Sequence, residues 1–359
     1  MTKEKKPQID AGNSTVLQSM PNPALSPEQQ QQIAAAVKQL QAGGTVAFPT
    51  ETVYGLGADI AIPSAIRQIY ETKGRPADHP LIVHFAHISQ LTHWAKEIPE
   101  SAWKLATHFW PGPLTLILKR SQHVPQYVTG GQSTVGLRIP DHPIALALLN
   151  ALGAETALAA PSANRFGRIS PTTAAHVQDE LGKNVNMVLD GGACQVGLES
   201  TIVSFDDDAV SLLRPGGIPL SALETVLNDK ITINNHYKTT IRAPGTLNSH
   251  YAPATPLEIC PTQTICQRTR ELEAQNLCAA VITWSVAKSN PMINKNIVQF
   301  AMPQEPIAYG IQLYATLRRF DQKGFDRLLV EAPPDNAAWL AITDRFQRAS
   351  HNNTNNELK

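Results

Sequence analysis

Four short segments place hydroxyl or cationic side chains beside a glycine or proline at the end of a run that is typical of a strand. In open sheets, ligands bind in the crevice at strand ends, so side chains from all four segments could converge there. Hydroxyls, backbone amides and guanidinium groups supply directed donors to phosphate and carboxylate oxygens. The pattern therefore predicts an anion site. The segments are 48–59, 73–85, 160–173 and 197–205 with 212–217, and with Arg138 the candidate ligands are Thr50, Thr52, Ser162, Ser170, Thr172, Ser200, Thr201, Lys73, Arg75 and Arg214.

The second segment, KGRPADHPLIVHF, joins a cationic turn to a short apolar run. Its glycine and proline predict a turn that aims Lys73 and Arg75 into a cleft, with both side chains at the surface of that cleft. The run 81–83 predicts a strand through the core that brings His84 to the same pocket. Each piece also has an ordinary interpretation. Hydroxyl residues after a proline commonly cap helices, the two cations could lie in a solvated turn, and a lone strand histidine is usually a core or edge residue.

Other motifs carry little weight. Gly55-x-Gly57 lacks the third glycine of a dinucleotide fingerprint, and the sequence contains no phosphate-binding P-loop. The four cysteines show no C-x-x-C pair or zinc-ligand spacing, so they indicate reduced thiols and no metal site. Lys plus Arg equals Asp plus Glu, which argues against a broad nucleic-acid or membrane surface. Without an apolar membrane span or a secretory signal, we expect a cytoplasmic protein.

The order of elements predicts two domains. Short β-branched runs alternate with helical patterns from Ser26 to about 222, which is typical of an α+β or α/β sheet domain. Residues 223–255 hold few apolar clusters and three prolines, and we interpret them as a linker. Strand-like and helical segments alternate again over 256–349, which predicts a small doubly wound domain. Residues 1–25 and 350–359 are polar and predict flexible tails.

The order and spacing of these motifs resemble the YrdC-like family in its two-domain form, the L-threonylcarbamoyladenylate synthases. Lys73-x-Arg75 and Ser162-x-Asn164 are similar to that family's signature pair. The resemblance implies a YrdC-like twisted α+β open sheet domain at 26–222, followed by a linker and a small Rossmann-like domain. It rests on FPTETVYGLG, KGRP, PLTLIL, VGLRIP, APSAN followed by SPTT, GLESTIV, LLRPG and, after the linker, PGTLNSHYAP.

The resemblance also implies a nucleotidyltransferase reaction, in which L-threonine, bicarbonate and ATP give threonylcarbamoyl-adenylate and pyrophosphate. A threonine carbamate would attack the α-phosphorus of ATP. Magnesium would arrive with the nucleotide, because no carboxylate cluster is typical of a dedicated metal site. The product would pass to a separate transferase complex for threonylcarbamoyladenosine modification of tRNA, next to the anticodon.

The family pattern further implies roles for individual residues. Lys73 and Arg75 would be catalytic, with Lys73 close to the phosphates. Tyr251 lies in the HYAP stretch, so the linker would fold over the site as a lid that excludes water. L-Threonine and its carbamate would contact Thr52, His84, Arg138, Ser162 and Ser200, and ATP would contact Lys73, Arg75, His79, Thr134, Asn164, Thr172, Arg214 and Tyr251.

This chain departs from the family at His79, where asparagine is usual, although an imidazole can also donate a hydrogen bond. Two other functions stay open on the sequence. One is a module that binds double-stranded RNA or tRNA without catalysis, and the balanced net charge counts against it. The other is a carbamoyltransferase domain that uses carbamoyl phosphate, whose usual zinc-finger-like segments the cysteine count excludes.

Overall fold

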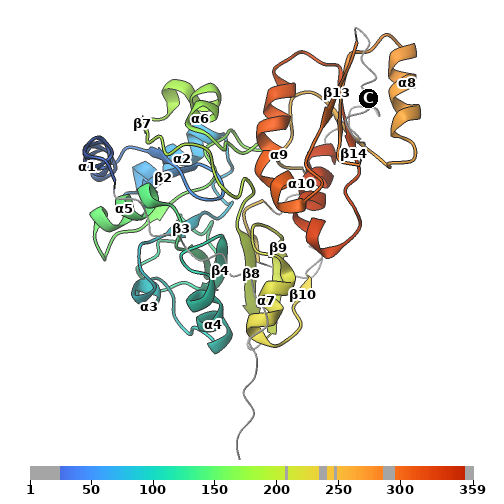
Figure 1. Ribbon diagram of the computed structural model, residues 1–359. Helices are drawn as coiled ribbons and strands as arrows, with labels where there is room; N and C mark the ends of the chain where they lie inside the picture. Colours follow the sequence, from blue (N-terminus) through green and yellow to red (C-terminus); the bar gives the residue numbers. More distant parts are fainter. Residues whose placement is uncertain (1–24, 207–208, 234–240, 246–248, 286–295, 352–359) are drawn as a thin grey trace, which may run out of the picture.

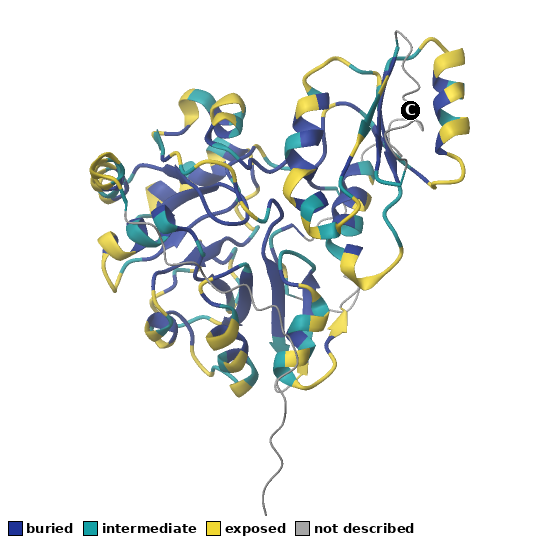
Figure 2. Cartoon of the chain, viewed as in Figure 1, coloured by how far each residue is buried: buried dark blue, intermediate teal, exposed yellow. Residues whose placement is uncertain are grey.

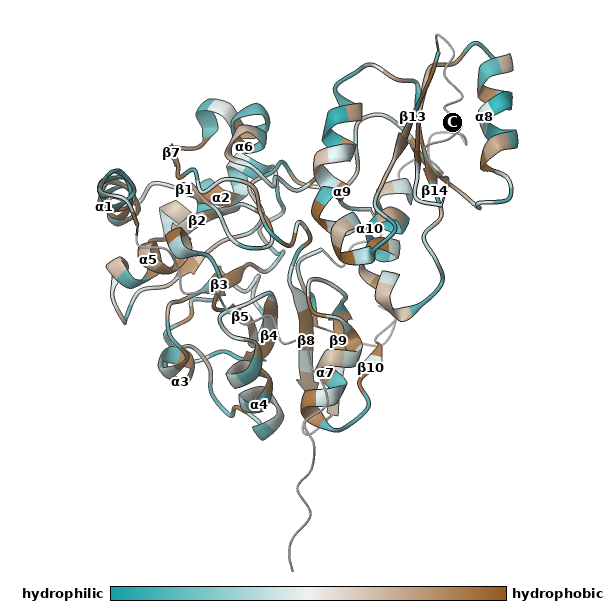
Figure 3. Cartoon of the chain, in the orientation of Figure 1, coloured by the Kyte–Doolittle hydropathy of each residue, from teal (hydrophilic) through white to brown (hydrophobic). Residues whose placement is uncertain are grey.

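The computed structural model describes residues 25–206, 209–233, 241–245, 249–285 and 296–351. Within these residues the chain forms two α/β units, each built on its own sheet (Figure 1). The central strands of both sheets are buried, and the exposed residues lie mainly on the outer sides of the helices, in the loops and on edge strands (Figure 2). Figure 3 shows the same distribution as apolar strands beneath helices of mixed hydropathy.

The first unit contains a mixed sheet of ten strands in the described chain. β3 pairs in parallel with β5 and β4 with β8, whereas β4 and β5 are antiparallel. The order across the sheet is β10 (Thr232–Ile233), β9 (Ala209–Arg214), β8 (Thr201–Asp206), β4 (Leu114–Lys119), β5 (Thr134–Arg138), β3 (Ile82–His84), β6 (Leu158–Ala159), β2 (Gly55–Asp59), β1 (Val46–Phe48) and β7 (Met187–Val188).

Seven helices of the described chain accompany this sheet, and two of them show clear local causes. α1 begins after Ser26, whose side chain accepts from the backbone of Gln29 in a capping box, as the sequence predicts. α2 ends at Gly74, which adopts the left-handed conformation that glycine tolerates and turns the chain toward Arg75. The helices are α1 (Pro27–Gln41), α2 (Pro63–Lys73), α3 (Leu91–Trp94), α4 (Glu100–Phe109), α5 (Pro143–Leu152), α6 (Ala174–Leu181) and α7 (Leu220–Leu227).

The second unit is a parallel sheet with the order β11 (Leu257–Cys260), β14 (Arg327–Glu331), β12 (Ala279–Thr283) and β13 (Ile297–Ala301). Successive strand residues face opposite sides. Ala280 and Val330 pack in one apolar cluster with α9 (Pro306–Asp321) and α10 (Leu340–Ser350), whereas Val281 and Leu329 pack in another with α8 (Ile265–Ala274). The predicted doubly wound domain is confirmed.

The two units meet along α9 and α10 (Figure 1). One apolar cluster contains Ile169 and Leu198 of the first unit together with Leu313 of α9. Gly197 has a φ of +73°, and a Cβ there would lie 2.6 Å from the Cα of Ile311. A glycine at this position is therefore what lets the backbone of α9 approach the first unit closely.

The linker prediction needs correction at its start. The expected boundary at 222/223 falls inside α7, and β10 pairs with β9 of the first sheet, so this sheet extends to Ile233. The predicted boundary was wrong because α7 is amphipathic. It buries Leu223 fully without forming a continuous apolar run in the sequence. The predicted tails lie outside the described residues, apart from Leu25, Ser350 and His351.

The stretch 55–59 forms β2 in the middle of the order β6-β2-β1, whereas the sequence predicted only a polar segment beside a strand end. Its two glycines hid the strand, because glycine has a low strand propensity. A Cβ on Gly57 would lie 2.7 Å from the ring of Phe48, so this strand needs glycine for packing.

Candidate active site

A cavity lies where the predicted strand ends converge, and residues 244, 245, 250 and 251 of the linker form one of its walls. It takes its lining from the β1–β2 connection, the ends of β3, β5 and β9, the segment after β6 and the segment before β8. Nine of the predicted ligands line it, namely Thr50, Thr52, Arg75, His84, Arg138, Ser162, Ser200, Arg214 and Tyr251. The sequence therefore predicted correctly that these distant segments meet.

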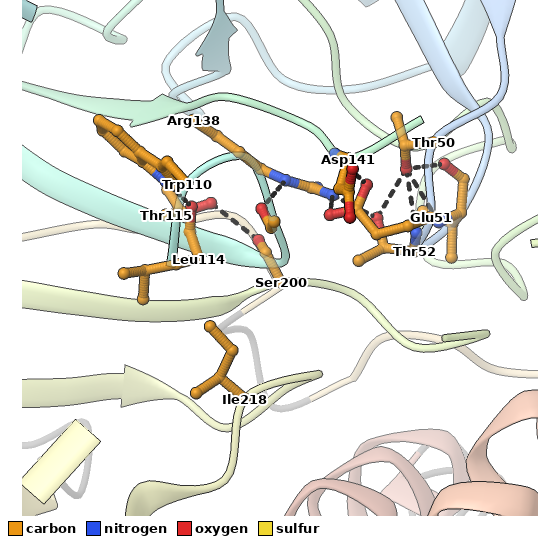
Figure 4. A network of polar contacts seen from close by, with 12 residues as sticks. Thr50, Glu51, Thr52, Trp110, Leu114, Thr115, Arg138, Asp141, Ser200 and Ile218 are labelled. Carbon is orange, nitrogen blue, oxygen red and sulfur yellow. Dashed lines mark hydrogen bonds and ion pairs between the residues drawn. The ribbon is translucent and has the colours of Figure 1, made fainter. Parts of the chain in front are cut away.

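Arg138 lies at the end of β5, and its guanidinium is already engaged on one side (Figure 4). Its Nη2 donates to Glu51 Oε1 at 2.7 Å and to Thr52 Oγ1 at 2.9 Å, and its Nε donates to the carbonyl of Gly112 at 3.3 Å. Glu51 Oε2 in turn accepts from the backbone N–H of Asp141 at 3.0 Å. These contacts fix the direction of the guanidinium and leave Nη1 as the nitrogen for a ligand carboxylate.

Sequence reasoning missed Glu51. Its side chain and that of Arg138 are each 5% exposed, so they form a buried ion pair. The signal was present in principle, because a buried arginine needs a charged or carbonyl partner. The two residues are 87 positions apart, however, and no local pattern pairs them.

His84 ends β3 and is buried against the edge of Phe48. Burial and the nearby charge of Arg138 lower the pKa of His84 to about 3. The imidazole is therefore neutral at pH 7 and serves the cavity as a hydrogen-bonding group without charge. Its Nδ1 lies 3.2 Å from the carbonyl of Ile82, and the backbone of Leu158 is a second hydrogen-bond partner of the ring.

A prediction follows for stability against pH. Between about pH 6.5 and about pH 3 an unfolded chain binds a proton at residue 84 that the folded chain does not, so stability falls as the pH falls through this window. One such proton changes the free energy of unfolding by about 1.4 kcal/mol per pH unit. His84→Gln should reduce the slope between pH 4 and 6 by about this amount, measured by denaturant unfolding. An unchanged slope would contradict the buried neutral imidazole.

Arg214 connects the end of β9 to the linker. Its Nε and Nη2 donate to the carbonyl of Ser200 at 3.1 and 2.8 Å, and its Nη1 donates to the carbonyl of Pro244 at 2.9 Å. Ser200 Oγ also lies 2.8 Å from Thr115 Oγ1. Arg214 is 3% exposed, so these carbonyls replace the water that a guanidinium would otherwise bind.

The sequence predicted Lys73 at the surface of the cleft, and this prediction is wrong. Its Nζ donates to the carbonyls of Ser162 and Asn164 at 2.6 and 2.5 Å, and the residue is 3% exposed and absent from the cavity lining. Burial, with the neighbouring charge of Arg75, lowers the pKa of Lys73 well below its usual value. The side chain, at the last residue of α2, therefore holds the Ser162–Asn164 loop through these two carbonyls.

Arg75 lies on the cavity side of the same turn. Its Nη2 donates to the carbonyl of Pro80 at 2.9 Å, and its guanidinium lies 5.6 Å from the ring centroid of Phe166. Within the described chain its buried Nε has no hydrogen-bond partner, and the same holds for Asn164 Oδ1. Buried polar atoms without partners are candidates for ligand contacts.

The remaining predicted ligands lie outside the cavity lining. His79 packs edge-on against Phe166, with ring centroids 5.3 Å apart. The backbone N–H of Thr172 donates to His176 Nδ1 at 3.2 Å, and Thr134 begins β5 at the end opposite to Arg138. The structure therefore brings together the predicted threonine ligands, but His79, Thr134, Asn164 and Thr172 lie beyond the cavity with Lys73.

The linker wall contains residues in unusual environments. Tyr251 has a φ of +60° and is 1% exposed, and its hydroxyl is among the buried groups of the described chain without a partner. A Cβ on Gly245 would lie 2.1 Å from that hydroxyl, so glycine lets the linker pass directly over it. His250, which the sequence did not single out as a ligand, is 6% exposed and also lines the cavity.

Glu199 is the second acidic residue that sequence reasoning missed. It lines the cavity and is 6% exposed. Burial alone would raise its pKa, but the charges of Arg345 and Arg214 lower it to about 2, so the carboxylate is ionised. Ser170, Tyr314 and Arg345 donate hydrogen bonds to its two oxygens.

In the described part of the chain no three His, Cys, Asp or Glu residues lie close enough to hold a metal ion. Cys194 is buried, and burial raises the pKa of its thiol to about 12, which makes it a poor nucleophile. None of the helices in the described residues is both long enough and apolar enough to cross a bilayer.

Comparisons with known proteins agree with this geometry. Residues 38–216 match the Sua5/YciO/YrdC family model, described as "Telomere recombination", and residues 218–351 match "Threonylcarbamoyl-AMP synthase, C-terminal domain". The threonylcarbamoyl-AMP synthases of Pyrococcus abyssi and Bacillus subtilis are 39% and 41% identical to the chain. The matches cover 89% of this chain in both cases, and 94% and 93% of the relatives.

A solved structure matches over the same extent. The crystal structure of P. abyssi Sua5 complexed with L-threonine superposes with a TM-score of 0.81 at 37% identity, and the match covers 89% of this chain and 94% of that one. The similarity therefore includes both units and the linker between them.

Proposed function

Because the chain belongs to the Sua5/YciO/YrdC family of threonylcarbamoyl-AMP synthases, we propose that its cavity binds L-threonine beside ATP and joins the two through bicarbonate. The protein is an enzyme of the nucleotidyltransferase type. The overall reaction converts L-threonine, bicarbonate and ATP into threonylcarbamoyl-AMP, pyrophosphate and water.

The observation that carries the proposal is the arrangement of three buried arginines around one cavity. Arg138, Arg75 and Arg214 all line it, and Glu51 pairs with only one side of the Arg138 guanidinium. A site with surplus buried positive charge needs an anionic ligand to balance it. Threonine brings one carboxylate, its carbamate brings a second, and ATP brings the phosphates.

The proposed chemistry has two stages. Bicarbonate takes up a proton and loses water to give carbon dioxide, and the threonine amine adds to its carbon and releases a proton, which gives the carbamate. A carbamate oxygen then attacks the α-phosphorus of ATP, and this second stage forms one bond and breaks one. The bond between the α-phosphorus and the bridging oxygen breaks, and pyrophosphate leaves with the electron pair. Catalysis of such a transfer depends on positioning and on neutralising charge, which fits the hydroxyls and guanidinium groups of the cavity.

The proposed roles divide the cavity into two sides. Arg138 holds the threonine carboxylate through its available Nη1, with Thr52, His84, Ser162 and Ser200 around the amino acid and its carbamate. Arg75, Arg214 and Tyr251 face the nucleotide, and Lys73 holds the Ser162–Asn164 loop in place. His79, Thr134, Asn164 and Thr172 extend the nucleotide side beyond the cavity.

Magnesium enters as part of the substrate, bound to ATP. Glu199 is a carboxylate of the cavity lining, and its two oxygens already accept from Ser170, Tyr314 and Arg345. This donor set is unsuited to a resident metal ion, which needs oxygens with available lone pairs. The linker residues Gly245 and Tyr251 act as a lid that keeps water from the reactive adenylate.

The test is pyrophosphate release by the purified protein with magnesium-ATP, with and without L-threonine and bicarbonate. We expect release that requires both. A folded protein that releases none would contradict the proposal and favour the alternative, a double-stranded RNA or tRNA-binding module without catalysis. A titration of RNA affinity against salt would then follow, because binding through phosphates weakens steeply with salt.

The unstable product also implies a partner. We propose that a separate threonylcarbamoyl transferase consumes the adenylate for tRNA modification, in the cytoplasm where threonine and ATP are available. The check is transfer of labelled threonine to tRNA, which should require a second protein fraction in addition to this chain.

His79 gives a smaller prediction for the nucleotide side. Its pKa is lowered by burial and by the charge of Arg75, so the ring is neutral at pH 7 and can donate one hydrogen bond. His79→Ala should raise the KM for ATP about fivefold, the usual loss for one hydrogen bond, and His79→Asn should restore it. Equal KM values in all three proteins would remove His79 from the nucleotide subsite.

A further inference from the structure

The carboxylate of Glu199 is held largely by the second domain. Tyr314 of α9 donates to its Oε2 at 2.8 Å and Arg345 of α10 donates to the same oxygen at 2.7 Å. From the first domain, Ser170 Oγ donates to Oε1 at 2.5 Å. A residue of the cavity wall thus depends on two side chains that do not themselves line the cavity.

Arg345 makes contact with more than Glu199. Its Nη2 donates to the carbonyl of Pro215 at 3.0 Å, directly after Arg214. Its guanidinium carbon lies 4.8 Å from the centroid of the Tyr251 ring, in cation–π geometry. A single side chain, 1% exposed, therefore touches the segment before β8, the end of β9 and the linker.

These three segments reach the cavity, where Arg214 and Tyr251 lie on the proposed nucleotide side and Glu199 precedes Ser200. Glu199, Arg214 and Tyr251 all line the cavity, and the planar guanidinium gives each neighbouring segment a different contact: an ion pair, a carbonyl hydrogen bond and a ring face. The remaining Nη1 donates to Asp344 Oδ2 at 2.6 Å, so a residue of the same helix also fixes the orientation of the guanidinium. A lysine could not make these contacts together, because its ammonium is a single point charge.

We propose that Arg345 is a positioning residue of the nucleotide subsite, through which the second domain sets the placement of Glu199, Arg214 and Tyr251. The inference rests on the proposed function, since it needs ATP on that side of the cavity. Arg345 touches no substrate, and it acts through the three segments that it holds.

Arg318 provides a matched control. It is also a buried arginine of the second domain, 6% exposed, and it pairs with a first-domain glutamate, Glu180, at 2.9 Å. It further donates to the carbonyls of Ile169 and Ser170. None of these three partners lines the cavity. Arg318 holds the carbonyl of Ser170, whereas the Ser170 hydroxyl is the group that donates to Glu199, so loss of Arg318 removes a comparable domain contact and leaves the direct contacts of Glu199 in place.

The experiment measures KM for ATP, KM for threonine and kcat of pyrophosphate release in the full-length protein, with thermal unfolding of each variant. Arg345→Met should raise the KM for ATP about tenfold, because a desolvated cation–π contact and a carbonyl bond are lost, and should change the KM for threonine less than about twofold. Arg345→Lys should recover only part of the ATP affinity. Arg318→Met should lower thermal stability while both KM values stay unchanged.

If Arg345→Met and Arg318→Met both lower the fraction of folded, active protein but leave both KM values unchanged, Arg345 only stabilises the fold and the inference is wrong. Should Arg345→Met fail to fold, the double variant Glu199→Gln with Arg345→Met removes both charges of the buried pair and is expected to fold. It should keep the raised KM for ATP, and a normal KM in this variant would also overturn the inference. A wild-type protein without threonine-dependent release would instead refute the proposed function.

Discussion

Replacing Arg75 by methionine should lower the rate of pyrophosphate release by about 10²–10³-fold, the usual loss for one preorganised group that stabilises developing charge. Arg75 lines the cavity with a buried Nε that has no partner in the described chain, so part of its guanidinium is available for phosphate oxygens. Burial lowers its pKa only to about 10, and the side chain is therefore charged at pH 7.

The Arg75→Met variant should stay folded. Methionine keeps an unbranched stem near the Phe166 ring. Among the described residues, the hydrogen bond lost is that to the carbonyl of Pro80, at a cost of about 1–3 kcal/mol. The measurement is steady-state pyrophosphate release, with circular dichroism as the folding control. Arg75→Lys keeps the positive charge but not the planar guanidinium, and its rate of pyrophosphate release should lie between those of the wild type and Arg75→Met. A folded Arg75→Met protein with more than a tenth of the wild-type rate would contradict the assignment.

Replacing Arg138 by methionine should have two large effects. It removes the proposed ligand of the threonine carboxylate, so threonine-dependent turnover should be lost. It also leaves the Glu51 carboxylate buried without its 2.7 Å partner, which typically destabilises a protein by about 3–5 kcal/mol. Activity and stability are therefore expected to fall together in the single variant.

A second substitution separates these effects. In Glu51→Gln with Arg138→Met no charge of the pair remains, and most of the lost stability should return, measured as the free energy of unfolding in denaturant. Turnover should stay at the background of threonine-free reactions, because the carboxylate ligand is still missing. Recovery of activity together with stability would show that Arg138 only supports the fold.

The sequence was sufficient to predict the strand ends that form the cavity. Each segment contains a short apolar or β-branched run next to glycine or proline, and this pattern can be recognised in a single sequence. The segments are 48–59, 73–85, 160–173 and 197–205. The predicted ligands Thr52, His84 and Arg138 followed from those strand ends and from the family resemblance, and all three line the cavity.

The buried ionic partners could not be predicted in the same way. Glu51 and Arg138 are 87 positions apart, and Glu199 and Arg345 are 146 positions apart in two different domains. Pairing over such distances depends on tertiary packing, which composition and periodicity do not encode. The inward direction of Lys73 was missed for a related reason, because a charged residue beside a glycine usually faces solvent unless carbonyls such as those of Ser162 and Asn164 replace the water.

The contact of Arg345 with Glu199 also joins two segments that leave the ribosome at different times, because they are 146 positions apart. The parallel pairing of β4 with β8 joins residues 114–117 to 201–204, so the large sheet cannot close until most of the first domain has left the ribosome. The guanidinium that we propose positions the nucleotide side comes from α10, the last helix of the described chain. A nascent chain that has not yet added α10 therefore carries most of the proposed substrate ligands but lacks the arginine that positions them, and we expect it to bind ATP more weakly than the full chain.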